Sequence, residues 1–367
     1  MKKIGILTFH RAINYGAILQ MYALYTFLKD NDCNIDIIDY LNSGIESEYA
    51  IISKNNDLKT NLKNIIKNIL FYKKIVNKRR KFERFIDNNF TFSEKFYNSE
   101  DMKIIDGVYD AFITGSDQIW NSTITNGIDD GYFLDFCNKS KKISYAASFG
   151  SNEILKNNFN EIVERLSKFD AISIREEDAV KYINEKTSLI TKNVVDPTIL
   201  LTAKEWSKII PTSKYNGRKY IFLYSVGDKN ASKREMCLKI AKKLSKKENL
   251  EIIDYSLKNN HDTVDAYCDG PLEFLDAIRN AEYVVASSFH GAVFSIIFNK
   301  KMWIATNSNT GVRVQNLMNK FGLSNRILDE KKSDEELSKA INFDSINKKL
   351  ERERKKSSDW LIKQVNK

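Results

Sequence analysis

Short apolar runs that end in polar or small residues recur along this sequence, and they constrain its fold more than any other feature. The chain opens with the run KIGILTF, a polar loop, an amphipathic stretch over 17–29, and a second apolar run that ends at Tyr40. Short apolar runs of this kind are typical of buried parallel strands, and an amphipathic stretch with a period of 3.6 residues is typical of a helix. The first forty residues therefore predict a β-α-β unit.

The same alternation continues through most of the chain and predicts an α/β fold built on parallel sheets. A polar stretch at 211–217 separates two series of elements. The ligand-binding loops of such sheets lie at the carboxyl ends of the strands, so polar residues directly after a strand are the candidates for a site. The further elements predicted are strands at 111–114, 143–147, 171–174, 220–226, 250–255 and 283–286, and helices at 231–244, from Pro271, and at 292–298.

With 367 residues, the chain exceeds the length at which a single hydrophobic core usually keeps growing, so two domains are expected. We place an N-terminal domain at 1–205 and a second domain at 206–330. The final segment, 331–367, has a charged helical pattern with a few apolar members. We expect it to pack across a neighbouring surface.

The net charge of +10 favours anionic partners, among them nucleic acid, phosphorylated small molecules and acidic membrane surfaces. Much of the excess lies in 54–81, where apolar residues recur at helical spacing among lysines. This stretch is interpreted either as a solvated helix face or as a contact with an anionic membrane. Nothing in it resembles the aromatic stacking pattern of a known nucleic-acid module, so no nucleic-acid partner is expected.

The chain has no recognisable signal peptide and no apolar run of the roughly 20 residues needed to cross a bilayer. Its four cysteines form no C-x-x-C pair, which argues against a zinc site and a disulfide framework. These features predict a cytoplasmic protein, with peripheral binding at the inner face of the membrane as an option.

His290 is the most suggestive of the three histidines. It follows the strand predicted at 283–286, shares a loop with Ser288, and precedes Gly291 and a helix. Free backbone N–H groups at a helix N-terminus hold anions, so this loop is a candidate anion site. The alternative is a histidine with a purely structural role.

His10 follows the first strand, in a loop with Asn14, Tyr15 and Gly16. This is a position where α/β domains contact ligands, so all four are candidates for binding. The third histidine, His261, lies in a polar run and is predicted to be a surface residue.

Two further strand ends carry polar side chains. Arg175 follows the strand 171–174 and could grip a carboxylate or phosphate as a fork; the alternative is an ion pair with the neighbouring glutamates. After the strand 111–114, Asp117, Gln118 and Trp120 could bind a sugar by hydrogen bonds and ring stacking. A capped loop and a core tryptophan would give the same pattern.

Several catalytic motifs are missing from the sequence. It contains no G-x-G-x-x-G fingerprint, no Walker loop, no G-x-S-x-G elbow and no histidine pattern for a metal. Nicotinamide enzymes, P-loop kinases, serine hydrolases of that type and zinc hydrolases are disfavoured.

An ordered set of motifs spread over residues 2–300 resembles the polysaccharide pyruvyl transferase family. The runs are KIGILTFHRAINYGAILQMYAL, DAFITGSDQIWN, KKISYAASFG, DAISIREEDA, VVDPTILL and PLEFLDAIRNAEYVVASSFHGAVFSIIFNK. The resemblance implies two Rossmann-like domains that face a cleft, as in GT-B glycosyltransferases, with a C-terminal helix that packs back on the first domain. It also implies phosphoenolpyruvate as the donor and a sugar as the acceptor, which we expect to be a free sugar, a glycan or a lipid-linked sugar. The expected chemistry needs no redox cofactor, and the sequence offers no convincing metal site.

Carried over to this chain, the resemblance assigns His290 the role of the catalytic histidine and Arg175 that of a donor-binding arginine. Many members of the family have an arginine two positions before the histidine, where this chain has Ser288. Another cation is then expected to assist the donor, and Arg313 and Arg11 are the candidates.

The expected reaction moves the pyruvyl group of phosphoenolpyruvate onto a sugar of a bacterial polysaccharide as a cyclic ketal and releases phosphate. Two alternatives stay open at this point. One is a glycosyltransferase of the same fold that uses a nucleotide sugar, because fold does not determine function. The other is a non-catalytic module that binds anions.

Overall fold

The computed structural model describes residues 1–48, 58–225, 231–256, 262–306, 311–328, 336–337 and 339–367. They form two compact units. Unit 1 comprises Met1–Asn68, Ile86–Leu201 and Arg352–Lys367, and unit 2 comprises Ile69–Phe85 and Thr202–Glu351. His261 lies outside the described residues.

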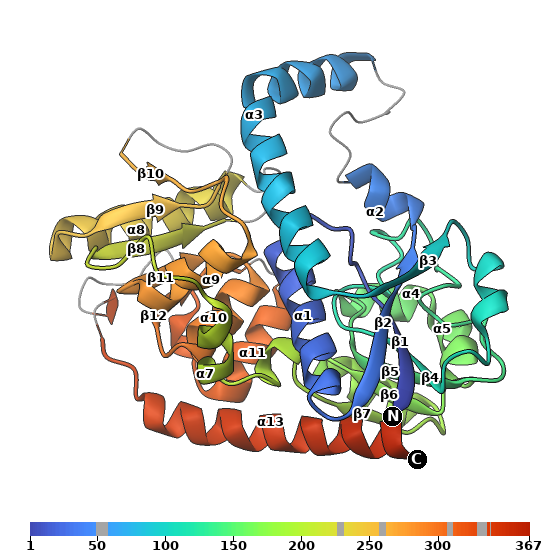
Figure 1. Ribbon diagram of the computed structural model, residues 1–367. Coiled ribbons are helices and arrows are strands. Elements are labelled where there is room, and N and C mark those ends of the chain that lie inside the picture. The colour runs from blue at the N-terminus through green and yellow to red at the C-terminus, as the bar shows by residue number, and fades with distance from the viewer. Residues whose placement is uncertain (49–57, 226–230, 257–261, 307–310, 329–335, 338) are drawn as a thin grey trace. The chain divides into compact units, whose positions relative to one another are not determined.

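Unit 1 contains a seven-stranded sheet in which all neighbouring strands are parallel (Figure 1). Its order is β3-β2-β1-β4-β5-β6-β7, so the chain first winds outward in one direction and then continues on the other side of β1. The strands are β1 (Lys2–Leu7), β2 (Cys33–Tyr40), β3 (Phe92–Phe96), β4 (Ala111–Thr114), β5 (Lys141–Ala147), β6 (Ala171–Ile174) and β7 (Thr191–Asn193).

The helix that follows β1 begins two residues earlier than the sequence predicted, because Asn14 caps it. The Oδ1 atom of Asn14 accepts hydrogen bonds from the backbone N–H groups of Gly16 (2.9 Å) and Ala17 (3.4 Å). The helices and 3-10 turns between the strands of this sheet are α1 (Tyr15–Lys29), α2 (Ser43–Glu48), α3 (Leu58–Asn89), η1 (Asp101–Ile105), α4 (Asn152–Asn157), α5 (Phe159–Leu166) and α6 (Glu177–Lys186), and η2 (Pro197–Ile199) follows β7.

Unit 2 contains a five-stranded sheet, again with parallel neighbours, in the order β10-β9-β8-β11-β12. Its strands are β8 (Tyr220–Tyr224), β9 (Glu251–Asp254), β10 (Val264–Asp265), β11 (Tyr283–Ala286) and β12 (Lys301–Ile304). The accompanying helices and turn are α7 (Ala203–Ile209), α8 (Ala231–Glu248), α9 (Pro271–Asn280), α10 (Phe289–Ile297), α11 (Val312–Phe321), η3 (Ser324–Arg326) and α13 (Phe343–Asn366).

The division between the units differs in detail from the predicted domains. The chain passes into unit 2 at Thr202, close to the predicted start at 206, but residues 69–85 of α3 also group with unit 2. The last part of α13, residues 352–366, groups with unit 1. There the Ser357 hydroxyl accepts a hydrogen bond from the Val195 N–H (3.0 Å). The C-terminal helix therefore packs on the first domain, as the family resemblance implied.

Both sheets reverse their strand order once, between β1 and β4 in unit 1 and between β8 and β11 in unit 2. At such a switch point the loops after the two adjacent strands diverge and leave room for a ligand at the carboxyl ends. The predicted site residues on the loops after β1, β4 and β11 therefore lie where an α/β sheet usually binds ligands.

The described part of the basic stretch on α3 makes contacts within unit 2. Lys74 pairs with Asp265, and Lys81 donates to Glu273 at 2.6 Å. Lys78 is 7% exposed, with its ammonium 4.5 Å from the centre of the Tyr267 ring. These lysines hold residues 69–85 of α3 in unit 2, an outcome that neither sequence interpretation of the stretch included.

Candidate functional site

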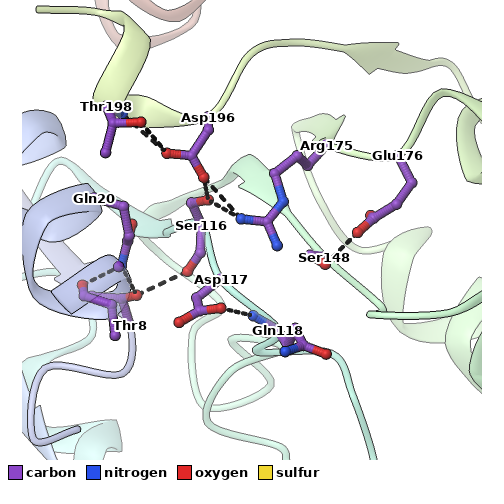
Figure 2. A network of polar contacts seen from close by, with 12 residues as sticks. Thr8, Gln20, Ser116, Asp117, Gln118, Ser148, Arg175, Glu176, Asp196 and Thr198 are labelled. Atoms are coloured by element: carbon purple, nitrogen blue, oxygen red, sulfur yellow. Dashed lines mark hydrogen bonds and ion pairs between the residues drawn. The ribbon is translucent and has the colours of Figure 1, made fainter. Parts of the chain in front are cut away.

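The predicted donor-binding arginine of unit 1 lies in a buried polar network at the carboxyl ends of the strands (Figure 2). Arg175 Nη1 donates to Asp196 Oδ2 at 2.8 Å and contacts Ser116 Oγ at 3.4 Å. Ser116 Oγ in turn donates to Asp196 Oδ2 at 3.1 Å. The ion-pair partner of Arg175 is thus a residue 21 positions later and not one of the adjacent glutamates.

This ion pair is shielded from water, with side-chain exposures of 4% for Arg175 and 0% for Asp196. Burial alone would lower the pKa of Arg175, but the negative charges of Asp196 and Glu176 outweigh it and raise the pKa above its ordinary value. The guanidinium is therefore held as a cation in a partly apolar setting, where electrostatic forces are strong. Donor binding by Arg175 stays a prediction.

Asp117 and Gln118 follow β4, next to this network, and both are half-buried (Figure 2). Asp117 has a φ of 78°, and Ala146 on the neighbouring strand β5 has a φ of 51°. A left-handed backbone costs a residue with a Cβ roughly 1–2 kcal/mol, and such strain collects at functional sites. Asp117 Oδ1 accepts from the Gln118 N–H at 2.9 Å, which holds the carboxylate close to its own backbone.

Trp120 does not suit the predicted role of stacking on a sugar. Its side chain is buried, with the ring stacked on Phe133 at 5.2 Å and 13°, and its Nε1 donates to the Tyr132 carbonyl at 3.2 Å. Tyr15, also predicted to bind the acceptor, is fully buried as the first residue of α1. Both rings are buried in the hydrophobic core. For Trp120 this agrees with the alternative interpretation, a core tryptophan.

His10 is buried, and each of its ring nitrogens faces an acceptor. Nε2 lies 2.9 Å from Asp39 Oδ1, and Nδ1 lies 3.2 Å from the Thr8 carbonyl oxygen. Arg11 Nη1 also donates to Asp39 Oδ1, at 2.9 Å. Burial alone would raise the pKa of Asp39, but the hydrogen bond and charge of His10 and the charge of Arg11 lower it below its ordinary value.

The loop after β1 is therefore held by its own residues. Arg11, a candidate for the additional cation, is engaged by two carboxylates, since its Nε donates to Glu46 at 2.9 Å. Asn14 caps α1, and Gly16 is buried in the first turn of that helix. These contacts shape the switch point of unit 1 and leave Asp117 and Gln118 as the half-buried polar candidates of the acceptor set.

His290 lies within a helix, not in the loop that the sequence predicted. The Ser288 hydroxyl accepts from the Gly291 N–H at 2.8 Å and caps α10, so the helix begins at Phe289. His290 is half-buried in the first turn, with its ring edge to face with that of Phe289 at 5.2 Å. The cap gives Ser288 a structural role at the start of this helix.

Gly291 is required by close packing at this turn. A Cβ atom there would lie 2.8 Å from Ser288 Oγ and 2.9 Å from Ala286 Cβ, both shorter than normal contacts. The helix can therefore start directly over the end of β11. This brings its positively polarised N-terminus to the switch point of unit 2.

Arg313, the other candidate cation, is half-buried on α11 in unit 2. Burial lowers the pKa of Lys233, and the positive charge of Arg313 lowers it further. The two cations are therefore near enough to repel each other. Both cations add positive charge to this part of unit 2.

Sequence reasoning missed Ser116, Asp196 and Glu176 as members of the unit 1 network. Glu176 is 3% exposed and accepts a hydrogen bond from the Ser148 hydroxyl. Asp196 caps η2, with Thr198 Oγ1 donating to its Oδ1 at 2.7 Å. The D-P-T sequence signals that cap, but it gives no sign of the contact with Arg175.

Two classes of feature are not found among the residues that the structure describes. No group of three or more His, Cys, Asp or Glu side chains there is arranged to hold a metal ion. In the same part of the chain, no helix combines the length and apolar character needed to cross a bilayer.

Comparison with known families gives a match over most of the chain. The model of a family described as polysaccharide pyruvyl transferase matches residues 14–309. No curated protein matches the sequence significantly.

Solved structures resemble this chain in fold over nearly its whole length. A UDP-GlcNAc 2-epimerase from Methanocaldococcus jannaschii, in complex with UDP-GlcNAc and UDP, has a TM-score of 0.54 and 14% identity, covering 99% of each chain. MnaA from S. aureus, in complex with UDP, has a TM-score of 0.50 and 14% identity, covering 98% of this chain and 91% of its own. At such identities the likeness shows the fold alone.

Proposed function

Because the chain belongs to the polysaccharide pyruvyl transferase family, we propose that it transfers the pyruvyl group of phosphoenolpyruvate to a sugar as a cyclic ketal and releases phosphate. The observation that carries the proposal is the position of His290, in the first turn of a helix that begins directly at the switch point of unit 2. A proton-transferring side chain there lies beside the end of the helix that favours anions.

The donor carries a carboxylate and a phosphate, so its site requires positive charge and N–H donors. In this proposal the N-terminus of α10 and Arg313 supply these features in unit 2, and Arg175 is the donor-binding candidate of unit 1. Ser288 contributes indirectly, since its hydroxyl fixes the start of α10.

The acceptor is a sugar, a glycan or a lipid-linked sugar, and a lipid carrier would bring the protein to the inner face of the membrane. Asp117 and Gln118 are suited to binding hydroxyl groups because both are polar, half-buried and placed at the switch point of unit 1. A carboxylate that accepts a hydrogen bond from a sugar hydroxyl orients the hydroxyl oxygen for attack.

The chemistry proceeds by proton transfer and two additions. Protonation of the methylene carbon turns it into a methyl group and makes the central carbon oxocarbenium-like. One sugar hydroxyl adds to that carbon and loses its proton, and a second displaces inorganic phosphate and loses its own. His290 supplies or removes these protons, a contribution typically worth about 10²–10⁴ in rate.

The likeness in fold to UDP-binding epimerases leaves a nucleotide-sugar donor as the alternative to exclude. Thermal unfolding in the presence of phosphoenolpyruvate, UDP and UDP-GlcNAc separates the two. A ligand at 100 times its Kd stabilises the native state by about 2.7 kcal/mol. We expect phosphoenolpyruvate to raise Tm; a rise with UDP-GlcNAc and none with phosphoenolpyruvate would contradict the proposal.

A further inference from the structure

Unit 2 contains a pocket of about 310 Å³ that the proposed reaction does not use. It lies among the C-terminal end of α11, η3 and the N-terminal turns of α13. Part of its lining is apolar, from Phe321, Leu323, Ile341 and Ile346. The rest is polar and includes two cations, Arg326 and Lys349.

Arg326 is unusual among the lining residues because it carries a charge and yet is only 2% exposed. Its Nη2 donates to the carbonyls of Lys339 (2.5 Å) and Ala340 (2.8 Å), and its guanidinium lies 5.0 Å from the centre of the Trp303 ring. Its Nη1 is buried and has no hydrogen-bond partner in the described part of the chain. A buried charged donor left unpaired costs about 1–3 kcal/mol or more, so this nitrogen favours an added acceptor.

The charged side chains among the described lining residues have one sign. Among the described residues that line it, none is acidic. Asp344, in the first turn of α13, is exposed and is not part of the lining. The pocket also faces the start of a 24-residue helix, where the backbone adds partial positive charge. Burial lowers the pKa of Arg326 from its ordinary value, as expected for a cation that has no carboxylate partner.

The pocket is separate from the candidate catalytic end of unit 2. Ile327 forms a parallel bridge with Ile304, the last residue of β12, so the residues before Ile327 run back toward the amino ends of the strands. The charge of Arg326 accordingly acts on the pKa of Tyr283, the first residue of β11. His290 follows the opposite, carboxyl end of β11.

We propose that this pocket binds a small organic anion, a phosphate or carboxylate that carries an apolar group. Lys349 would hold the anionic group beside the charge of Arg326, whose buried Nη1 has no partner among the described residues, and the side chains of Phe321 and Ile346 would cover the apolar group. The proposal stands on this pocket alone and is independent of the reaction that the protein catalyses.

Isothermal titration calorimetry of the full-length protein with phenyl phosphate tests it. We expect Lys349→Ala to weaken binding at least about fivefold, the scale of one lost charge contact. Lys348→Ala changes the exposed neighbour outside the pocket and should leave Kd unchanged, as should Arg313→Ala at the other end of the sheet. Inorganic phosphate should bind about tenfold more weakly than phenyl phosphate, because it buries no ring.

Three results would overturn the proposal. The first is an absence of binding to the unaltered protein. The second is binding that Lys349→Ala leaves intact; loss in Arg313→Ala instead would place the anion at the catalytic end. The third is equal affinity for inorganic and phenyl phosphate, which would show that the phenyl ring makes no favourable apolar contact. The test relies on Lys349 because replacing the buried Arg326 could also unfold the protein.

Discussion

Arg175 and Asp196 form an ion pair of 2.8 Å at the carboxyl ends of the unit 1 strands, and both side chains are buried. Taking two charges out of water is costly, and their attraction offsets that cost only while both are present. Loss of either charge should therefore destabilise unit 1, so the candidate donor-binding arginine also contributes to the stability of the fold.

Asp196→Asn should lower the free energy of unfolding by about 3–5 kcal/mol, because it leaves the Arg175 charge buried without its carboxylate. Urea denaturation measures the change. Glu177→Gln, which removes one partner of the exposed pair with Lys181, is the matched control and should cost less than about 1 kcal/mol. Equal effects of the two substitutions would contradict the structural role assigned to Asp196.

The double variant R175M/D196L separates donor binding from stability. Replacing both members of a buried ion pair with apolar residues is often neutral for stability. The leucine cannot accept from Thr198, so the variant also loses the η2 cap, at a cost of about 1 kcal/mol, and should still fold. If Arg175 binds the donor, the apparent affinity for phosphoenolpyruvate should fall at least about tenfold, as for the loss of a charged hydrogen bond. Calorimetry that shows unchanged affinity in this folded variant would exclude Arg175 from donor binding.

Asp117→Asn should raise the KM for the acceptor about tenfold or more, since it removes the charge from a group proposed to bind a sugar hydroxyl. Asparagine tolerates a left-handed backbone and can still accept from the Gln118 N–H, so the free energy of unfolding should change by less than about 0.5 kcal/mol. Asp117→Ala should additionally be destabilised. An unchanged acceptor KM in the asparagine variant would show that the Asp117 carboxylate does not bind the acceptor.

Lys78 should make the stability of the protein depend on alkaline pH. Burial lowers its pKa from 10.5 to about 8. Between these values the unfolded chain binds more protons than the folded one, so the free energy of unfolding should rise with pH, by up to about 3 kcal/mol. The contribution is complete above pH 10.5 and is lost as the pH falls through 8.

Lys78→Met should flatten this rise, and urea denaturation at pH 8 and pH 10 measures it. Lys73→Met, at an exposed position on the same helix, is the control and should retain the slope of the unaltered protein. Parallel pH dependences for Lys78→Met and the unaltered protein would show that Lys78 is not held in a desolvated state.

Local sequence patterns predicted most of the fold because the strands are short, apolar and bounded by polar residues. The strands predicted at 111–114, 171–174 and 283–286 have those bounds in the structure. The start of α10 was placed three residues late, because apolar periodicity does not register the cap that Ser288 forms. The family resemblance correctly implied the paired Rossmann-like domains and the returning C-terminal helix.

The candidate site was less predictable, because it depends on contacts between distant segments. Nothing near Arg175 in the sequence indicates that its partner is Asp196, and residue type alone does not tell whether Trp120 faces a ligand or the core. Buried position and hydrogen-bond partners decide such cases, and they emerge only when the strands are assembled into a sheet. In this protein the burial and hydrogen bonds of Trp120, Tyr15 and His10 indicate that these residues stabilise unit 1.

The most direct test of the account is phosphate release from phosphoenolpyruvate, followed by ³¹P NMR in the presence of sugar acceptors, for the unaltered protein and for His290→Gln. We predict acceptor-dependent release that falls at least about a hundredfold in the variant, with the thermal midpoint unchanged. Release at an undiminished rate from His290→Gln, or consumption of a nucleotide sugar with phosphoenolpyruvate left intact, would contradict the central claim.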